Sequence, residues 1–170
     1  MSRFRESNNS AMTFTAPDFT IADSRYFKLD ELRCKGRNCC GQSLKVNVRL
    51  LELLDAIRER FDAPLFVNSG YRCPRRNQQV GGSRDSQHMR GNAADIRPGV
   101  NSLRRFPELV GICGELNPPG MGVYSNGARS FVHVDCRPLA AGATLARWGE
   151  WNDEPVAYEL ALSQALVQAV

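Results

Sequence analysis

The stretch between residues 44 and 61 has the clearest periodicity in the chain. Apolar residues recur there at three- and four-residue steps, with charged residues between them. The apolar positions are Val48, Leu51, Leu54, Ile57 and Phe61. This pattern predicts an amphipathic helix that Pro64 stops. The chain must therefore fold around a core on which this helix packs.

Shorter segments predict the rest of a sheet and its covering helices. PLFVNSGYR and AADIRP favour strands, while MGVYSN and SFVHVDCR favour two strands that pair antiparallel across GARS. A helical turn is expected over residues 74–82 and a helix over residues 103–116. A terminal helix is expected to dock through Val156, Leu160, Leu162, Leu166 and Val167. The predicted class is α+β, with a small, mostly antiparallel sheet flanked by helices.

Length and composition favour one domain. A chain of 170 residues with 42% hydrophobic residues can bury a core of its own, so we expect an arm over residues 1–22 and a single domain over residues 23–170. The sequence lacks an apolar run of the roughly 18 residues that span a bilayer, and its start lacks a secretory pattern. We therefore expect a monomer that is cytoplasmic when synthesised and does not insert into membranes. The net charge of +4 is scattered, which argues against nucleic-acid binding.

Six cysteines stand at positions that lack paired CxxC motifs. We expect most of them to be small buried residues with reduced thiols. The group Cys34, Cys39 and Cys40 is the strongest candidate for a cross-link or a bound ligand, and the sequence leaves open whether these three pair.

The chain has only two histidines, and each stands near a carboxylate. His88 precedes Asp95 in SQHMRGNAADI, and His133 precedes Asp135 in FVHVDCR. A catalytic zinc ion takes three nitrogen or oxygen ligands and keeps a fourth position for water, which makes His88, Asp95 and His133 a suitable set. Histidines near acids also occur as satisfied core or surface groups. The residues alone leave both interpretations open.

Five motifs together resemble the zinc D-alanyl-D-alanine carboxypeptidases and their murein endopeptidase relatives, which share a fold with the hedgehog signalling domain. These motifs are SGYR, SQHMRGNAADI, GVYSN, FVHVD and RW. The most specific piece is S-x-H-x-x-G-x-A-x-D, which begins at Ser86 and ends at Asp95. The resemblance covers about residues 27–148. It implies one zinc ion held by His88, Asp95 and His133, and an Arg72 that contacts the substrate or the developing oxyanion.

The sequence departs from that family at the general base. Many members carry an acid three residues before the second histidine, or a histidine two before it, where this chain has Ser130 and Phe131. Strand alternation instead puts Asp135 and Arg137 on the face of His133. Asp135 could accept the proton from water, or it could orient His133 or Arg72.

Other residues near these motifs have weaker assignments. Ser86 and Arg137 are candidates for substrate binding. Trp148 could line a cleft, although a buried core position is the favoured interpretation. A nucleophilic role for Cys73 or Cys136 is rejected, because both histidines are needed as ligands and Cys136 points away from the face of His133.

The resemblance predicts a zinc metallopeptidase that hydrolyses peptidoglycan stem or cross-link peptides, as a carboxypeptidase or an endopeptidase. A phage lysin, which reaches the wall after release or virion delivery, fits the absence of a signal. Two alternatives stay open. One is a non-catalytic, zinc-containing wall-binding or structural module on the same fold, and the other is a zinc peptidase with a substrate outside the wall.

Overall fold

The computed structural model describes residues 24–167, which form a six-stranded sheet with helices around it. The expected arm over residues 1–22 lies outside this part of the chain. The helices are α1 (Val48–Phe61), α2 (Pro74–Gln79), α3 (Phe106–Leu116) and α4 (Tyr158–Val167), with the 3₁₀ turns η1 (Leu29–Leu32), η2 (Gln87–Arg90), η3 (Val100–Arg105) and η4 (Gly127–Arg129). The strands are β1 (Leu65–Ser69), β2 (Ala93–Pro98), β3 (Gly120–Ser125), β4 (Phe131–Asp135), β5 (Ala146–Trp151) and β6 (Glu154–Val156).

The predicted helix before Pro64 is confirmed as α1, which begins at Val48 rather than near residue 44. Asn47 caps it, because its side-chain oxygen accepts a hydrogen bond of 3.0 Å from the amide of Arg49. The buried face is Leu50, Leu51, Leu54, Ile57 and Phe61, whereas Val48 is 36% exposed. The helix therefore packs on the core as expected. Its buried face differs from the expected one only in that Leu50 takes the place of Val48.

The sheet has the strand order β1-β2-β4-β3-β5-β6. The predicted hairpin is confirmed, since β3 pairs antiparallel with β4. The expectation of a mostly antiparallel sheet is corrected, because β5 runs parallel to β3 and the sheet is mixed. The loop over residues 136–145 carries the chain past β3, so β5 joins on the far side of β3 in the same direction. RWGEW, for which the sequence pattern predicts no strand, forms most of β5.

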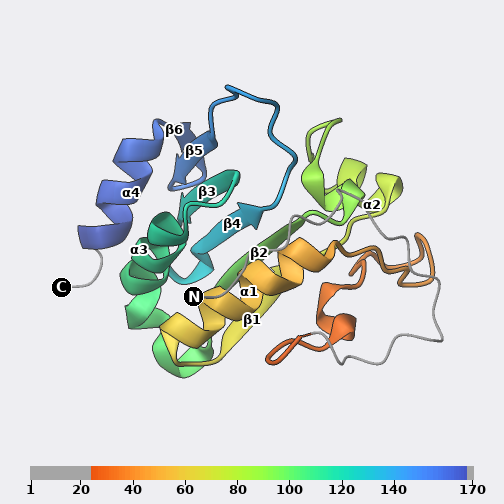
Figure 1. Ribbon diagram of the computed structural model, residues 1–170, viewed down its shortest axis with the longest axis horizontal. Coiled ribbons are helices and arrows are strands. Elements are labelled where there is room, and N and C mark those ends of the chain that lie inside the picture. Colours follow the sequence, from red (N-terminus) through yellow and green to blue (C-terminus); the bar gives the residue numbers. More distant parts are fainter. Residues whose placement is uncertain (1–23, 168–170) are drawn as a thin grey trace.

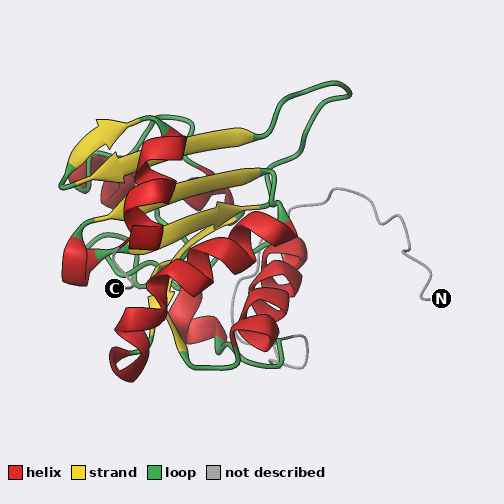
Figure 2. Cartoon of the chain, turned by 90° about the vertical axis from the view of Figure 1, so that its left-hand side faces the viewer, coloured by secondary structure: helices red, strands yellow, loops and turns green. Residues whose placement is uncertain are grey.

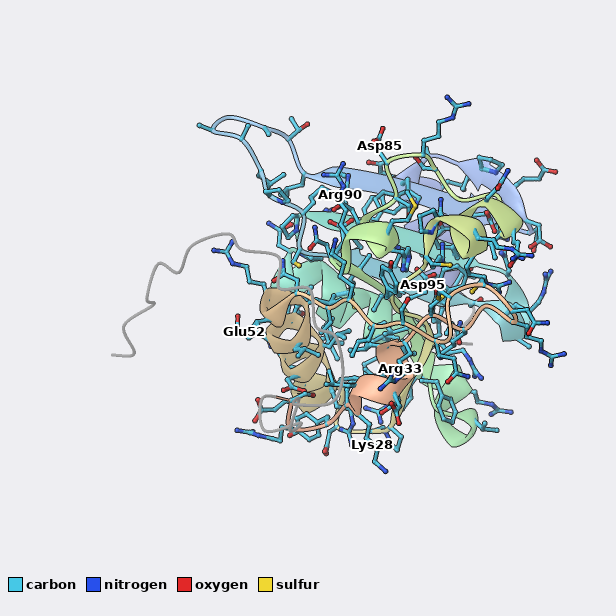
Figure 3. All side chains as sticks on the ribbon, turned by 90° about the vertical axis from the view of Figure 1, so that its right-hand side faces the viewer. Lys28, Arg33, Glu52, Asp85, Arg90 and Asp95 are labelled. Carbon is cyan, nitrogen blue, oxygen red and sulfur yellow. The ribbon has the colours of Figure 1, made fainter. Side chains whose placement is uncertain are left out.

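Helices α3 and α4 pack against one face of the sheet, and α1 packs on α3 (Figures 1 and 2). Alternate strand residues such as Ile96, Val132 and Val134 point into this core. Their neighbours in sequence therefore face the opposite side, where α2 and η2 lie (Figure 3). None of the helices in residues 24–167 is long and apolar enough to cross a membrane.

Two helix predictions need correction. The helix expected from residue 103 begins at Phe106, after η3. The terminal helix begins at Tyr158, because Val156 belongs to β6. Of the residues expected to dock, Val156 and Leu162 pack partly buried against the core, whereas Leu160, Leu166 and Val167 are exposed. The fully buried residues of the helix are Ala161 and Ala165. A Cβ on Gly149 of β5 would overlap the Cβ of Ala161. The helix lies so close to the sheet that only small side chains fit between them.

Candidate metal centre

Strand register brings residues from five strands into one row on the face opposite α3 and α4. Asp95 of β2 is the direct partner of His133 in β4, and His133 is the partner of Gly122 in β3. Ser69 of β1 and Trp148 of β5 complete the row at its two ends. Two of the three predicted ligands thus lie side by side on adjacent strands.

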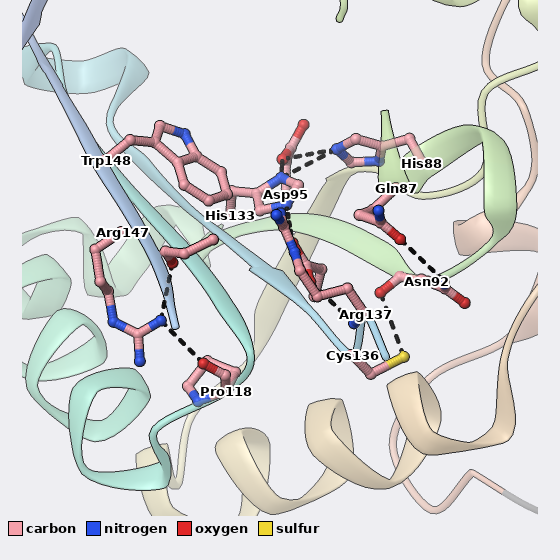
Figure 4. Close-up of polar contacts among 12 residues, drawn as sticks. Gln87, His88, Asn92, Asp95, Pro118, His133, Cys136, Arg137, Arg147 and Trp148 are labelled. Carbon is pink, nitrogen blue, oxygen red and sulfur yellow. Dashed lines mark hydrogen bonds and ion pairs between the residues drawn. The ribbon is translucent and has the colours of Figure 1, made fainter. Parts of the chain in front are cut away.

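His88 reaches the same point from η2, which Gly91 ends with a left-handed φ of 74°. Its Nδ1 lies 2.7 Å from the carbonyl oxygen of Gly70. A carbonyl can only accept a hydrogen bond, so Nδ1 carries the proton and Nε2 keeps a lone pair. That Nε2 lies 3.1 Å from Oδ1 of Asp95 and 3.2 Å from Nδ1 of His133 (Figure 4).

The ring of His133 is fixed in the complementary tautomer. Its Nε2 lies 3.2 Å from Oδ2 of Asp135, which accepts the proton of that nitrogen. Its Nδ1 lies 2.9 Å from Oδ1 of Asp95. Both histidines therefore direct a lone pair at Oδ1 of Asp95, an arrangement that a cation between the three atoms would stabilise.

The donor atoms fit zinc. Bonds of about 2.0–2.1 Å place the nitrogen and oxygen ligands of a tetrahedral site about 3.3 Å apart. The three atoms of His88, Asp95 and His133 are separated by 2.9–3.2 Å. All three residues also line a cleft of about 600 Å³. The structure thus brings the predicted ligand set together with one side open to the cleft.

Asp135 lies behind His133 and not in the cleft. It is fully buried, and its carboxylate accepts hydrogen bonds from the backbone amide (3.0 Å) and Nε (2.8 Å) of Arg137. A Cβ on Gly120, its partner in β3, would overlap this carboxylate. Because His133 turns its other nitrogen toward His88 and Asp95, Asp135 stands on the far side of the imidazole ring from the donor cluster.

The proton affinities of the site follow from these contacts. Burial alone would raise the pKa of Asp95, but His88 and His133 hold it well below its usual value. Burial would likewise raise the pKa of Asp135, and hydrogen bonds from Arg137 and His133 lower it instead. Burial would lower the pKa of His133, yet Asp135 and Asp95 raise it. Both carboxylates are therefore anionic in the range where histidine titrates.

Arg72 holds the second oxygen of Asp95. Its Nη2 forms an ion pair with Oδ2 of Asp95, and its Nε donates a hydrogen bond of 2.7 Å to Oγ of Ser69. The backbone amide of Arg72 donates to the carbonyl of His88 at 3.2 Å. Arg72 also lines the cleft. Arg72 therefore forms an ion pair with a predicted metal ligand and also borders the cleft.

Trp148 forms a wall of the cleft, which corrects the expectation of a buried core residue. Its ring centroid lies 4.9 Å from that of His133, and its Nε1 donates a hydrogen bond of 2.9 Å to the hydroxyl of Tyr124. A Cβ on Gly122 would overlap the indole. Glycine at this position in β3 therefore lets the tryptophan of β5 lie over β3 toward the ligand on β4.

Ser86 and Arg137 both line the cleft, as their predicted role requires, although Arg137 is largely bound to Asp135. Glu150 lines it too and was missed from the sequence. Strand alternation from Trp148 would have indicated it, had RWGEW been recognised as a strand. Cys136 packs in the helix-side core, in agreement with its rejection as a nucleophile.

Comparison with known proteins gives one family. The family model described as Peptidase M15 matches residues 25–135, which include η1, the three candidate metal ligands and Arg72. No curated protein matches the chain.

Proposed function

The chain belongs to the peptidase M15 family, and we propose that it is a zinc metallopeptidase that hydrolyses peptidoglycan stem or cross-link peptides. The observation that supports the proposal best is the convergence of two imidazole nitrogens and one carboxylate oxygen at the floor of a cleft. The proposal includes cleavage either at the end of a peptide or within a cross-link. It also includes a role as a phage lysin.

His88, Asp95 and His133 would hold a zinc ion, which would polarise the substrate carbonyl and lower the pKa of water to about 7. The surrounding residues keep the ligands in place. The Gly70 carbonyl and Asp135 fix the tautomers of His88 and His133, and Arg72 fixes the orientation of Asp95. In this proposal Asp135 is a positioning residue and not the general base.

The charges of the cleft fit a peptide that carries a carboxylate. Arg72 and Arg137 line it from opposite ends of the ligand row, and a guanidinium binds a carboxylate or an oxyanion through a planar pair of donors. Ser86 adds a hydroxyl at the rim. The indole of Trp148 covers His133 on one side and limits the access of solvent.

The position of Asp135 favours one second candidate, a zinc-containing module that binds wall peptides without cutting them. Within the described residues, the carboxylates that line the cleft are Asp85, Asp95 and Glu150. Asp95 is held by both histidines and Arg72, which leaves Asp85 and Glu150 as possible proton acceptors. A protein in which neither accepts a proton would keep the metal and the cleft but lose turnover.

The deciding experiment is mass spectrometry of fragments released from purified peptidoglycan by the zinc-loaded protein and by its His133→Ala variant. The enzyme releases peptide fragments whose new ends identify the bond cut, and the variant releases at least about 10³-fold fewer, since a metal ion contributes several kcal/mol to the barrier. Equal release by both overturns the proposal. No release by either, with peptide binding retained, supports the binding module. All-L peptides serve as the test for a substrate outside the wall.

A further inference from the structure

Four cysteines gather at a second place, where the loop between η1 and α1 passes beside the start of α2 (Figure 1). Cys34, Cys39 and Cys40 come from the loop, and Cys73 is the residue that precedes α2. Their sulfur atoms all lie within 4.8 Å of one another. Cys34 and Cys73 are buried, and the other two are partly exposed.

The distances between these sulfur atoms separate metal binding from disulfide formation. Sγ of Cys39 lies 3.7 Å from that of Cys34 and 3.6 Å from that of Cys40. A disulfide needs about 2.05 Å. Bonds of about 2.3 Å place the sulfur ligands of a tetrahedral zinc site about 3.8 Å apart. We propose that Cys34, Cys39, Cys40 and Cys73 hold a second zinc ion as a tetrathiolate.

The loop is held by a few hydrogen bonds, such as that from the amide of Cys34 to the carbonyl of Ser43 (3.1 Å), and not by a regular element. Residues 33–47 contain no helix or strand, and part of the loop surrounds an open hollow of about 1210 Å³. Three of its residues, Asn38, Gly41 and Gln42, have a positive φ. A cross-link at its centre therefore provides the stability that a hydrophobic core provides elsewhere.

The backbone also packs closely around the sulfur atoms, as expected for a preformed metal site. A Cβ on Gly36 would come within 2.5 Å of Sγ of Cys39, so the backbone passes directly over that sulfur. The amide of Arg76, in the first turn of α2, donates a hydrogen bond of 3.4 Å to Sγ of Cys73. Such a bond stabilises a thiolate, which is the form that binds zinc.

The charge of the surroundings complements the proposed centre. Zinc with four thiolates carries a net charge of −2, and binding releases the four thiol protons without any redox change. Residues 33–45 contain Arg33, Lys35, Arg37 and Lys45 but no acid. Arg75 and Arg76 add two more cations next to Cys73. This basic segment lowers the electrostatic cost of a buried dianionic centre.

The site would connect the loop to the catalytic cleft. Cys73 directly follows Arg72, whose guanidinium holds Asp95. The amide of Tyr71, on the other side of Arg72, donates a hydrogen bond of 2.8 Å to the carbonyl of Leu32 at the end of η1. The second zinc ion would thus tie the loop to the backbone at Cys73, on the other side of Arg72 from the hydrogen bond to Leu32.

The test counts metal ions in the purified full chain by elemental analysis and native mass spectrometry. We expect two zinc ions in the parent, one in His133→Ala and one in the double variant Cys34→Ser/Cys73→Ser. The control Cys136→Ala removes a buried thiol outside the cluster and keeps two. In cobalt-substituted protein, the intense thiolate-to-cobalt charge-transfer band in the near ultraviolet is present in His133→Ala and absent in the double variant.

One ion in the parent, with all thiols free to react, overturns the proposal. So does a parent mass that is lower by the hydrogens of a disulfide within the cluster. Should the double variant fail to fold, the comparison of the parent with His133→Ala still decides. Peptide cleavage is not part of the readout, so failure of the proposed enzymatic function does not affect the result.

Discussion

The triad of His88, Asp95 and His133 and the cluster of four cysteines are the two places in the described chain where metal-binding side chains converge. The triad draws two ligands from paired strands and the third from a turn next to them. The cluster takes its sulfurs from an irregular loop and from the residue before α2. One site is built on a scaffold that exists without metal, and the other is built from a segment that lacks such a scaffold.

This difference corresponds to two uses of zinc. Catalytic sites keep an open position for water, and structural sites are closed by four protein ligands. The triad supplies three donors and opens on the cleft, whereas the cluster supplies four. Because the sheet already holds His133 and Asp95, metal at the triad would be free to serve chemistry. Metal at the cluster would serve to hold the loop.

The sharpest test of this division uses two adjacent residues, Arg72 and Cys73. We expect Arg72→Lys to lower kcat/KM for peptide cleavage about 10²–10³-fold, the usual cost of losing a preorganised donor to the reacting group, with the zinc count unchanged. Cys73→Ser should lower the zinc count by one and reduce cleavage less than Arg72→Lys does. Arg75→Lys, on the exposed face of α2, is the control that leaves both quantities unchanged. Loss of a zinc ion in Arg72→Lys would show that the two regions are not separate.

Asp135→Asn tests whether the support of a triad ligand can be weakened without removing the ligand. We expect cleavage and zinc affinity at the triad to fall together, by about 10–100-fold, because His133 loses the acceptor that fixes its tautomer. The acidic limb of the pH–rate profile should stay in place, since Arg137 and His133 hold the pKa of Asp135 below its ordinary value of 3.8. Asp62→Asn, at an exposed carboxylate that follows α1 and lies outside the cleft, is the control. A larger loss with unchanged zinc affinity would instead make Asp135 the general base.

The same substitution has a defined effect on stability. A carboxylate whose pKa is lower in the folded state stabilises that state above its unfolded pKa and loses this contribution as pH falls. Asp135 also raises the pKa of His133, and that part of the stability is lost as pH rises through the histidine range. The difference in unfolding free energy between the metal-free parent and Asp135→Asn should therefore be largest on the acidic side of the histidine range and shrink below about pH 4. Denaturant titrations at several pH values measure it.

The smallest effects come from a matched pair of glycine substitutions. Gly122→Ala should displace the indole of Trp148, destabilise the fold by about 1–3 kcal/mol and lower cleavage, with the cobalt–thiolate band unchanged. Gly36→Ala should press on Sγ of Cys39 and weaken that band, with cleavage nearly unchanged. Thermal unfolding, cobalt spectra and cleavage rates of both variants give the comparison. A weakened band in Gly122→Ala would contradict the independence of the two regions.

Some elements could be predicted from sequence because their signal is local. The α1 period of three and four residues, and the two strands joined by a short polar connection, are confirmed by the structure. The α4 face was predicted only in part. Leu162 packs against the core as expected, but the close approach to Gly149 puts Ala161 where a larger side chain would not fit, and Leu160 and Leu166 are exposed. RWGEW was not assigned because its partner β3 lies more than twenty residues earlier, and a parallel pairing leaves no turn signal.

The sequence by itself determined which imidazole and thiol ligands this protein can offer to a metal, since it has two histidines and six cysteines. It also determined the spacing that indicates the family. Only the tertiary structure decided which of these donors meet. The register of β2 against β4 sets Asp95 beside His133, the position of Asp135 decides which ring nitrogen of His133 is available, and the passage of the loop beside α2 brings Cys73 to Cys34. The contacts of His133 with Asp95 and with His88 join residues 38 and 45 positions apart, and such separations are closed by packing and not by local preference.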